Sequence, residues 1–191
     1  MLVGFGWGLT NFQNNIIERS NFNQLSYEAS SEYRHSFLLK YTIPNGHFRF
    51  KGGYSNSEIN GSGVINISLL NANSVPLNVR TETQLRTITL GLEYVLKDSL
   101  ISPYLGMDLL GSVFEDVDVY REDESGKVVK EVFPSKTKIG LGVNIGLGYT
   151  PIPGMELDIN LLYASLNLIG IEDFENNIAT IDISVSLLFI L

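Results

Sequence analysis

The sequence contains no cysteine and no long unbroken apolar run. Without cysteine there is neither a disulfide framework nor a thiolate for catalysis or metal binding. Hydrophobic residues make up 44% of the chain, yet no window approaches the roughly 18 consecutive apolar residues that a membrane helix needs. If the chain crosses a membrane, it does so as a closed sheet, because lipid offers no partner to backbone N–H and C=O groups.

Positive charge is also scarce, since 13 Lys and Arg stand against 21 Asp and Glu. Phosphate binding needs a basic face, so we expect no nucleic-acid partner. No linker rich in Pro, Gly and Ser divides the chain, which predicts one domain over 1–191. Met1 leads into the strand-like LVGFGWG without a basic start, so we expect this sequence to contain no signal peptide and to be the mature form of an exported chain.

The sequence does contain a strong period of two. In 137–149 the odd positions read Thr, Ile, Leu, Val, Ile, Leu, Tyr, whereas the even positions read Lys, Gly, Gly, Asn, Gly, Gly. Seven further segments alternate in the same way, near 3–10, 36–43, 47–54, 87–94, 105–110, 156–163 and 181–189. Each is close to the roughly 9–11 residues of a tilted membrane strand, so the pattern predicts eight strands.

The connections between these segments alternate in length. Three are short and rich in turn residues, at 44–46, 97–99 and 151–154. The others are long and polar, at 13–32, 58–83, 115–136 and 166–177. Short periplasmic turns and long extracellular loops are typical of an eight-stranded antiparallel up-and-down transmembrane β-barrel. Within the third loop, 116–132 alternates again around 124–127, which predicts a hairpin that projects beyond the membrane.

The composition of the two faces indicates which one points outward. A soluble ligand-binding barrel would turn its apolar face inward and remains the alternative. Here the other face is rich in Gly, Ser and Thr, which suits the narrow lumen of eight strands better than a water-facing surface. We therefore expect the apolar face to contact outer-membrane lipid.

Two sets of residues follow from this assignment. The first set contains charged residues of the inward face, and we expect them to form a lumenal charge network: Arg34, Lys40, Arg49, Lys51, Glu93, Asp108, Lys138, Glu156, Asp158 and Asp182. Such charges must pair, because an uncompensated buried charge costs several kcal/mol. The second set lies mostly at the ends of the apolar faces and predicts an aromatic girdle: Tyr41, Tyr54, Tyr94, Tyr149 and Tyr163.

Several passages carry a family resemblance, namely SPYLG at 102–106, GLGY at 146–149 and the final strand at 181–191. They resemble the small outer-membrane β-barrel family that includes the OmpX- and OmpA-type barrels. The resemblance covers the whole chain as a pattern, and it implies the outer membrane of a Gram-negative bacterium. One departure is the end of the chain, which reads Phe-Ile-Leu where such proteins usually end in an aromatic residue.

The sequence offers little chemistry. His35 and His47 fall near opposite ends of neighbouring strands, so we expect no shared metal site. Some eight-stranded barrels modify lipids with a His-x-Ser pair, but here Tyr163 stands two residues before Ser165, which leaves that serine without a base. The acidic third loop lacks the spacing of a Ca²⁺ loop. We expect neither a cofactor nor a metal, and no enzyme.

These observations favour a non-enzymatic outer-membrane barrel with a plugged lumen. Its loops would bind a surface ligand or dock it as a subunit of an outer-membrane complex. The first two loops carry apolar residues that favour an outer-membrane protein partner: Ile16, Ile17, Phe22, Ile65, Ile67, Leu69 and Leu70. A narrow pore for ions or small solutes is the main alternative function, and a lipid-modifying enzyme is the third.

Overall fold

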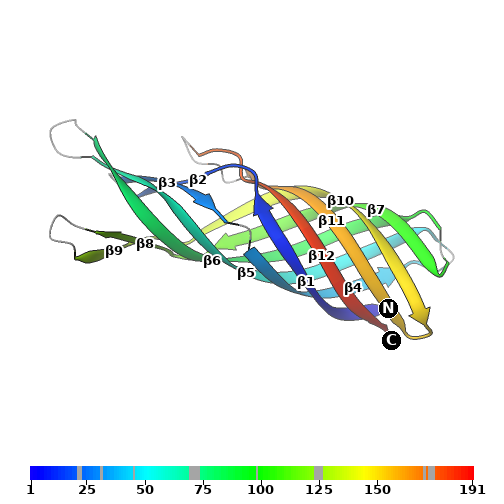
Figure 1. Ribbon diagram of the computed structural model, residues 1–191. Helices are drawn as coiled ribbons and strands as arrows, with labels where there is room; N and C mark the ends of the chain where they lie inside the picture. The colour runs from blue at the N-terminus through cyan, green and yellow to red at the C-terminus, as the bar shows by residue number, and fades with distance from the viewer. Residues whose placement is uncertain are drawn as a thin grey trace.

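The computed structural model describes residues 1–20, 23–30, 32–44, 46–68, 74–97, 99–122, 127–169, 171 and 175–191. These residues form one antiparallel sheet of twelve strands (Figure 1). The strands are β1 (Leu2–Phe12), β2 (Ile16–Ser20), β3 (Asn23–Ala29), β4 (Glu32–Thr42), β5 (Phe48–Ser68), β6 (Ser74–Val95), β7 (Ile101–Phe114), β8 (Val117–Glu122), β9 (Val128–Phe133), β10 (Lys136–Ile152), β11 (Met155–Ile169) and β12 (Ala179–Ile190). In this part of the chain, no helix is long and apolar enough to cross a membrane.

Eight of the strands close a barrel, which confirms the predicted fold class. Around the ring they follow the order β1, β4, β5, β6, β7, β10, β11 and β12, and β12 pairs with β1. When the strand pairing is followed around the ring from Phe5, the route through β4, β5 and β6 reaches Gly111 of β7, whereas the route through β12, β11 and β10 reaches Ile101 of β7. The two end points are ten residues apart on the same strand, which is the stagger of the barrel. Such a stagger tilts the strands against the barrel axis.

Short turns join the strands at one end of the barrel, here called the turn end. The tightest is Pro153-Gly154, between the paired residues Ile152 and Met155. Gly154 has φ +94°, the left-handed value that the third position of a type II turn requires and that favours glycine. Both chain termini also lie at the turn end, where the N–H of Leu191 donates to the carbonyl of Met1 at 2.9 Å (Figure 1).

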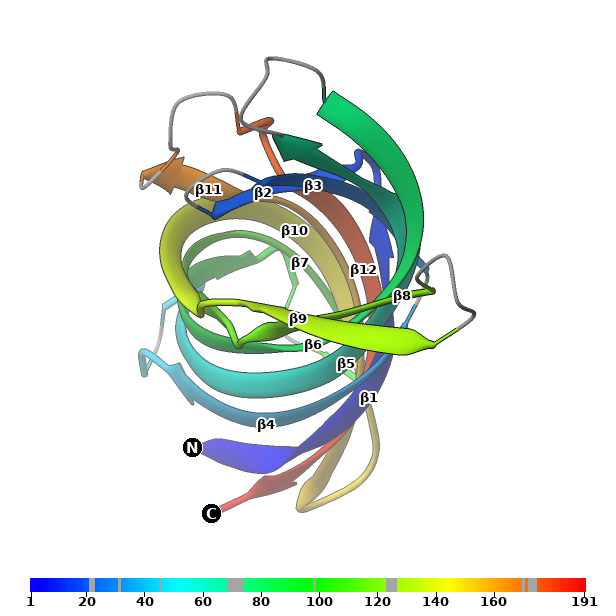
Figure 2. The ribbon, with the colours of Figure 1, turned by 90° about the vertical axis from the view of Figure 1, so that its left-hand side faces the viewer.

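The opposite end, here called the ribbon end, continues as a sheet beyond the barrel. β5 and β6 have 21 and 22 residues, and their far halves stay paired with each other. The β2–β3 hairpin pairs with the far half of β5, and the β8–β9 hairpin pairs with the far half of β6. The long connections therefore contain strands, and β8 and β9 occupy the position of the predicted projecting hairpin, whose tip at 123–126 lies outside the described residues (Figure 2).

The period of two sorts the side chains as the sequence predicts. Phe5, Ile88 and Val143 point out of the barrel and are more than half exposed. This orientation contradicts the soluble-barrel alternative, in which they would be buried. Charged residues avoid the outward band: of 21 Asp and Glu, fifteen fall in the four long connections and five are buried in the lumen.

The interior has two zones. Toward the turn end it is charged, whereas toward the ribbon end it is filled by a cluster of buried side chains that we call the apolar cap. The cap consists of Phe12, Ile16, Leu25, Tyr27, Ala29, Ile59, Ile65, Val79, Leu85, Leu110, Phe114, Val117, Val119, Phe133, Leu162, Ala164, Leu166 and Ile178. The apolar cap joins the barrel wall near the ribbon end to the β2–β3 and β8–β9 hairpins, because its members come from both.

Candidate functional site

The charged zone is centred on Glu93, whose side chain is fully buried. Strand register brings its partners together, since Arg49 pairs with Glu93 across β5 and β6, and Lys40 pairs with Lys51 across β4 and β5. Arg49 Nε donates to Glu93 Oε2 at 2.6 Å. Lys40 Nζ and Lys51 Nζ lie 3.3 and 3.7 Å from Glu93 Oε1. One carboxylate thus contacts three bases.

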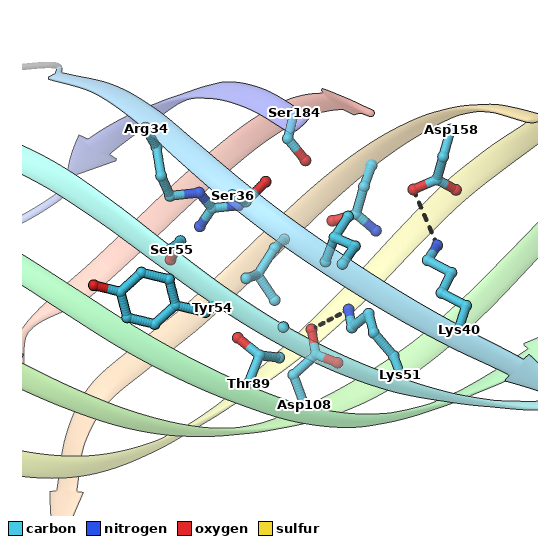
Figure 3. A pocket seen from close by; sticks show the side chains of 14 residues that line it. Arg34, Ser36, Lys40, Lys51, Tyr54, Ser55, Thr89, Asp108, Asp158 and Ser184 are labelled. Carbon is cyan, nitrogen blue, oxygen red and sulfur yellow. Dashed lines mark hydrogen bonds and ion pairs between the residues drawn. The ribbon is translucent and has the colours of Figure 1, made fainter. Parts of the chain in front are cut away.

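Strands β7 and β11 supply a second carboxylate to each base. Lys51 donates to Asp108 at 2.6 Å and Lys40 donates to Asp158 at 3.0 Å (Figure 3). Arg49 Nη1 donates to Glu156 at 3.0 Å. Three bases and four carboxylates, all at most 8% exposed, therefore form one charge cluster. Removing such charges from water is costly, and the cluster persists because each is paired and hydrogen-bonded.

Tyr104 lies at the heart of this cluster and was not singled out from the sequence. Its hydroxyl accepts a hydrogen bond from Asn160 Nδ2 at 3.0 Å. Its ring faces Lys40 Nζ at 4.6 Å and the Arg49 guanidinium at 4.7 Å, a cation–π arrangement. The sequence could have indicated this position through the alternation of β7. Tyr104 lies two residues before Gly106, so both side chains fall on the inward face of the strand.

Glycine opposite Tyr104 makes room for this ring. A Cβ at Gly146 would collide with the Tyr104 ring and approach the Ile159 carbonyl to 2.7 Å. We expect Gly146→Ala to lower the free energy of unfolding by about 1–3 kcal/mol, as overpacking does. Gly52→Ala is the matched control, because a Cβ there meets nothing within 4 Å. Urea unfolding of both variants in micelles measures the difference, and equal stabilities would contradict this packing.

Three of the predicted network residues lie outside the cluster. Arg34 Nη1 and Asp182 Oδ2 form a separate pair at 2.9 Å, farther toward the ribbon end. Lys138 is buried, and its carboxylate partner is Glu175, which also bonds Lys136. Glu175 belongs to the fourth long connection, so treating that range as a solvent loop hid it from the sequence analysis.

The five predicted girdle tyrosines all point outward, at different levels. Tyr41 and Tyr94 are the last-but-one residues of β4 and β6, and Tyr149 lies near the same turn end on β10. Tyr163 pairs with Ile181 near the ribbon end. Tyr54 pairs with Phe37 and Ile88, inside the apolar band rather than at its edge. The alternation fixes the face of a residue but not its level, so the girdle stays a prediction.

The ribbon end presents an acidic surface. A crevice of about 720 Å³ between β5, β6 and the start of β8 is lined by carboxylates, which are Glu58, Glu82, Glu115, Asp116 and Asp118. Several are paired: Arg86 lies 2.9 Å from Glu115, and Lys130 lies 2.8 Å from Asp118. The hydrogen bond to Asp118 raises the pKa of Lys130.

The remaining candidates for chemistry lie apart. His47 donates from Nδ1 to the Val95 carbonyl at 3.0 Å near the turn end, whereas His35 points outward on β4. Ser165 Oγ donates to Asn177 Oδ1 at 2.6 Å. Among the residues that the structure describes, no three His, Asp or Glu side chains are placed to hold a metal ion.

The closed ring, the outward apolar band and the long polar ends define an integral β-barrel protein of the bacterial outer membrane. In such barrels the short turns usually face the periplasm and the long connections face the exterior, so we expect the turn end to be periplasmic and the ribbon end extracellular. Known structures share this fold. Neisserial surface protein A is 18% identical, with a TM-score of 0.57 over 98% of this chain and 96% of that one.

Two further outer-membrane proteins match at similar extent. OprG from Pseudomonas aeruginosa is 13% identical, with a TM-score of 0.53 over 98% of this chain and 92% of its own. Ail from Yersinia pestis, solved with the heparin analogue sucrose octasulfate, is 10% identical, with a TM-score of 0.51 over 98% and 97%. No family model and no curated protein sequence matches this chain. At these identities the matches establish the fold alone.

Proposed function

We propose that this protein is a non-enzymatic surface-binding protein whose barrel is a sealed anchor for an extracellular sheet. The observation that carries the proposal is the six-stranded sheet β2-β3-β5-β6-β8-β9, which continues the barrel wall beyond the membrane. The apolar cap holds this sheet to the barrel. A rigid scaffold that presents exposed segments is the usual arrangement for binding.

The edge of this sheet supports a binding role. β9 is its terminal strand, and Val128 and Val132 are about half exposed along it. A terminal strand presents backbone N–H and C=O groups that can pair with an added strand. Partner proteins use such edges by adding an extended segment, and side chains next to the edge then select the sequence.

The charge of the extracellular end favours a cationic partner. The four long connections hold fifteen carboxylates and six basic residues. Ail was solved with a polyanion, and the acidic excess here argues against a ligand of that kind. We infer a partner with exposed lysine or arginine, attracted by the carboxylates and weakened by salt.

Binding to surfaces of defined charge tests this function. Reconstituted protein is expected to adhere to a lysine-rich peptide surface at low ionic strength and to release as salt rises, with no adhesion to heparin. Replacing 117–133, which contains β8 and β9, by a short Gly-Ser linker is expected to remove most of the adhesion while the barrel stays heat-modifiable. Adhesion that prefers heparin, or that survives the replacement, would contradict the proposal.

A sealed barrel supports the anchor role over the pore alternative. Two internal spaces in the described part of the lumen are small, about 40 Å³ beside Lys51 and Asp108 and about 10 Å³ beside Arg34 and Asp182. Eight strands leave an interior that side chains fill.

A further inference from the structure

The spaces inside the barrel are arranged in a series from the periplasmic mouth. A vestibule of about 630 Å³ opens there, with Arg49 and Glu156 among its lining residues. Beyond the charge cluster lies the cavity of about 40 Å³, lined by Lys40, Lys51, Asp108, Asp158 and several hydroxyl groups (Figure 3). The cavity of about 10 Å³ follows, where Arg34 meets Asp182. Polar side chains line each of these spaces.

Several buried polar atoms beside the two inner cavities have no hydrogen-bond partner in the described part of the chain. Within the described part of the chain, Asp108 Oδ1 and Asp158 Oδ1 accept no hydrogen bond beside the first cavity. Thr10 Oγ1, Thr180 Oγ1 and Asp182 Oδ1 are in the same position beside the second. Buried polar atoms are nearly always satisfied, by water where protein is not available. At roughly 10–15 Å³ per molecule, the first cavity accommodates about three waters and the second about one.

The polar series ends at an apolar constriction. The second cavity is bordered by four leucines from three strands, which we call the leucine ring: Leu85, Leu110, Leu162 and Leu166. All four belong to the apolar cap, which continues outward through Phe114. Packed apolar side chains exclude water, and hydrophobic constrictions block ions by the same means. Water that enters from the periplasm therefore stops at this level.

We propose that the lumen is a blind pore, hydrated from the periplasm to Thr10 and Thr180 and closed by the leucine ring. This inference rests on the proposed sealed barrel and locates its seal in the leucine ring and not in the charge cluster. The cluster holds four carboxylates and three bases, so it carries protons and small cations more readily than anions. Opening the ring would give the protein a narrow, cation-selective conductance.

Proton flux into liposomes that contain a pH-sensitive dye tests the position of the seal. The double substitution Leu110→Ser/Leu162→Ser is expected to raise the flux about tenfold or more over the unmodified protein, because hydroxyls let water wet the constriction. Lys51→Met/Asp108→Leu is the matched control, which removes one ion pair from the cluster and leaves the ring intact, and its flux is expected to stay at the unmodified level. A folded ring variant that remains tight, or a cluster variant that leaks equally, would overturn the proposal.

A measurement on the unmodified protein does not depend on the folding of a variant. Nuclear magnetic resonance in lipid nanodiscs detects transfer of magnetisation from water to nearby protons. The side-chain amide of Asn160, which lines the first cavity, is expected to receive it, whereas the methyl groups of Leu25 and Val119, which lie in the cap away from both cavities, are not. A dry Asn160 amide or a wet cap would refute the blind pore. Adhesion of the Leu110→Ser/Leu162→Ser variant to the lysine-rich surface is measured separately. A failure of the blind pore is thereby distinguished from a failure of the surface-binding function.

Discussion

Replacing Arg49 by methionine is expected to lower the free energy of unfolding by about 3–5 kcal/mol, the cost of removing one member of a buried ion pair. Arg49 is 2% exposed and contacts Glu93 at 2.6 Å and Glu156 at 3.0 Å. Methionine fills much of the volume but leaves four carboxylates facing two bases. Urea titration in micelles, followed by the fluorescence of Trp7, measures the loss; Trp7 is the single tryptophan and faces lipid.

Two comparisons show whether buried charge causes this loss. Arg86→Met makes the same substitution at an exposed pair with Glu115, where about 0–1 kcal/mol is expected. Glu93→Gln keeps the shape of the side chain and leaves three carboxylates with three bases, so its effect is expected to be smaller than that of Arg49→Met. If Arg49→Met proved no more harmful than Arg86→Met, the cluster would not be a buried network.

Arginine in place of Leu90 is expected to cost about 2–4 kcal/mol, the penalty for a charge at the bilayer midplane. Leu90 is 61% exposed on the outward face of β6, between Gly52 and Leu109 of the neighbouring strands. It lies about midway along the barrel part of its strand, so a guanidinium there has neither water nor a carboxylate in reach. The unfolding titration used for Arg49 measures this cost.

Gln84→Arg on the same strand is the matched control. Gln84 lies six residues before Leu90 in β6, toward the ribbon end, and lines the acidic crevice, so an arginine there meets water and carboxylates. A change of about 0–1 kcal/mol is expected, as near a membrane interface. A protein that tolerated arginine equally at both positions would not have its apolar face in lipid.

The barrel was predictable because a strand alternates its side chains between two faces. In 137–149 every inward residue is small or polar and every outward residue but Thr137 is apolar or aromatic, and the structure keeps this phase through β10. The same alternation of inward and outward positions, in β5 and β6, predicted that Arg49 and Glu93 point inward. Their direct pairing follows from register, which the turn lengths limit but do not determine.

Long-range geometry explains what the sequence did not disclose. Tyr104 and Gly146 meet because β7 pairs with β10 across the β8–β9 hairpin, and neither residue carries a local sign of the contact. The outer half of β5 is rich in Asn, Ser and Gly, which suggested a loop, yet β3 holds it as a strand, and β8 pairs with the outer half of β6. Glu175 was missed for a related reason, since its partner Lys138 lies 37 residues away.

Heat-modifiability of the purified protein in detergent tests the closed membrane barrel most directly. Boiled and unboiled samples are run side by side on a denaturing gel. We expect a compact, faster-moving unboiled band that shifts on boiling, because an intact barrel with its buried charge cluster resists the detergent. A protein that stays in solution without detergent and shows no shift would contradict the barrel and with it the outward apolar face.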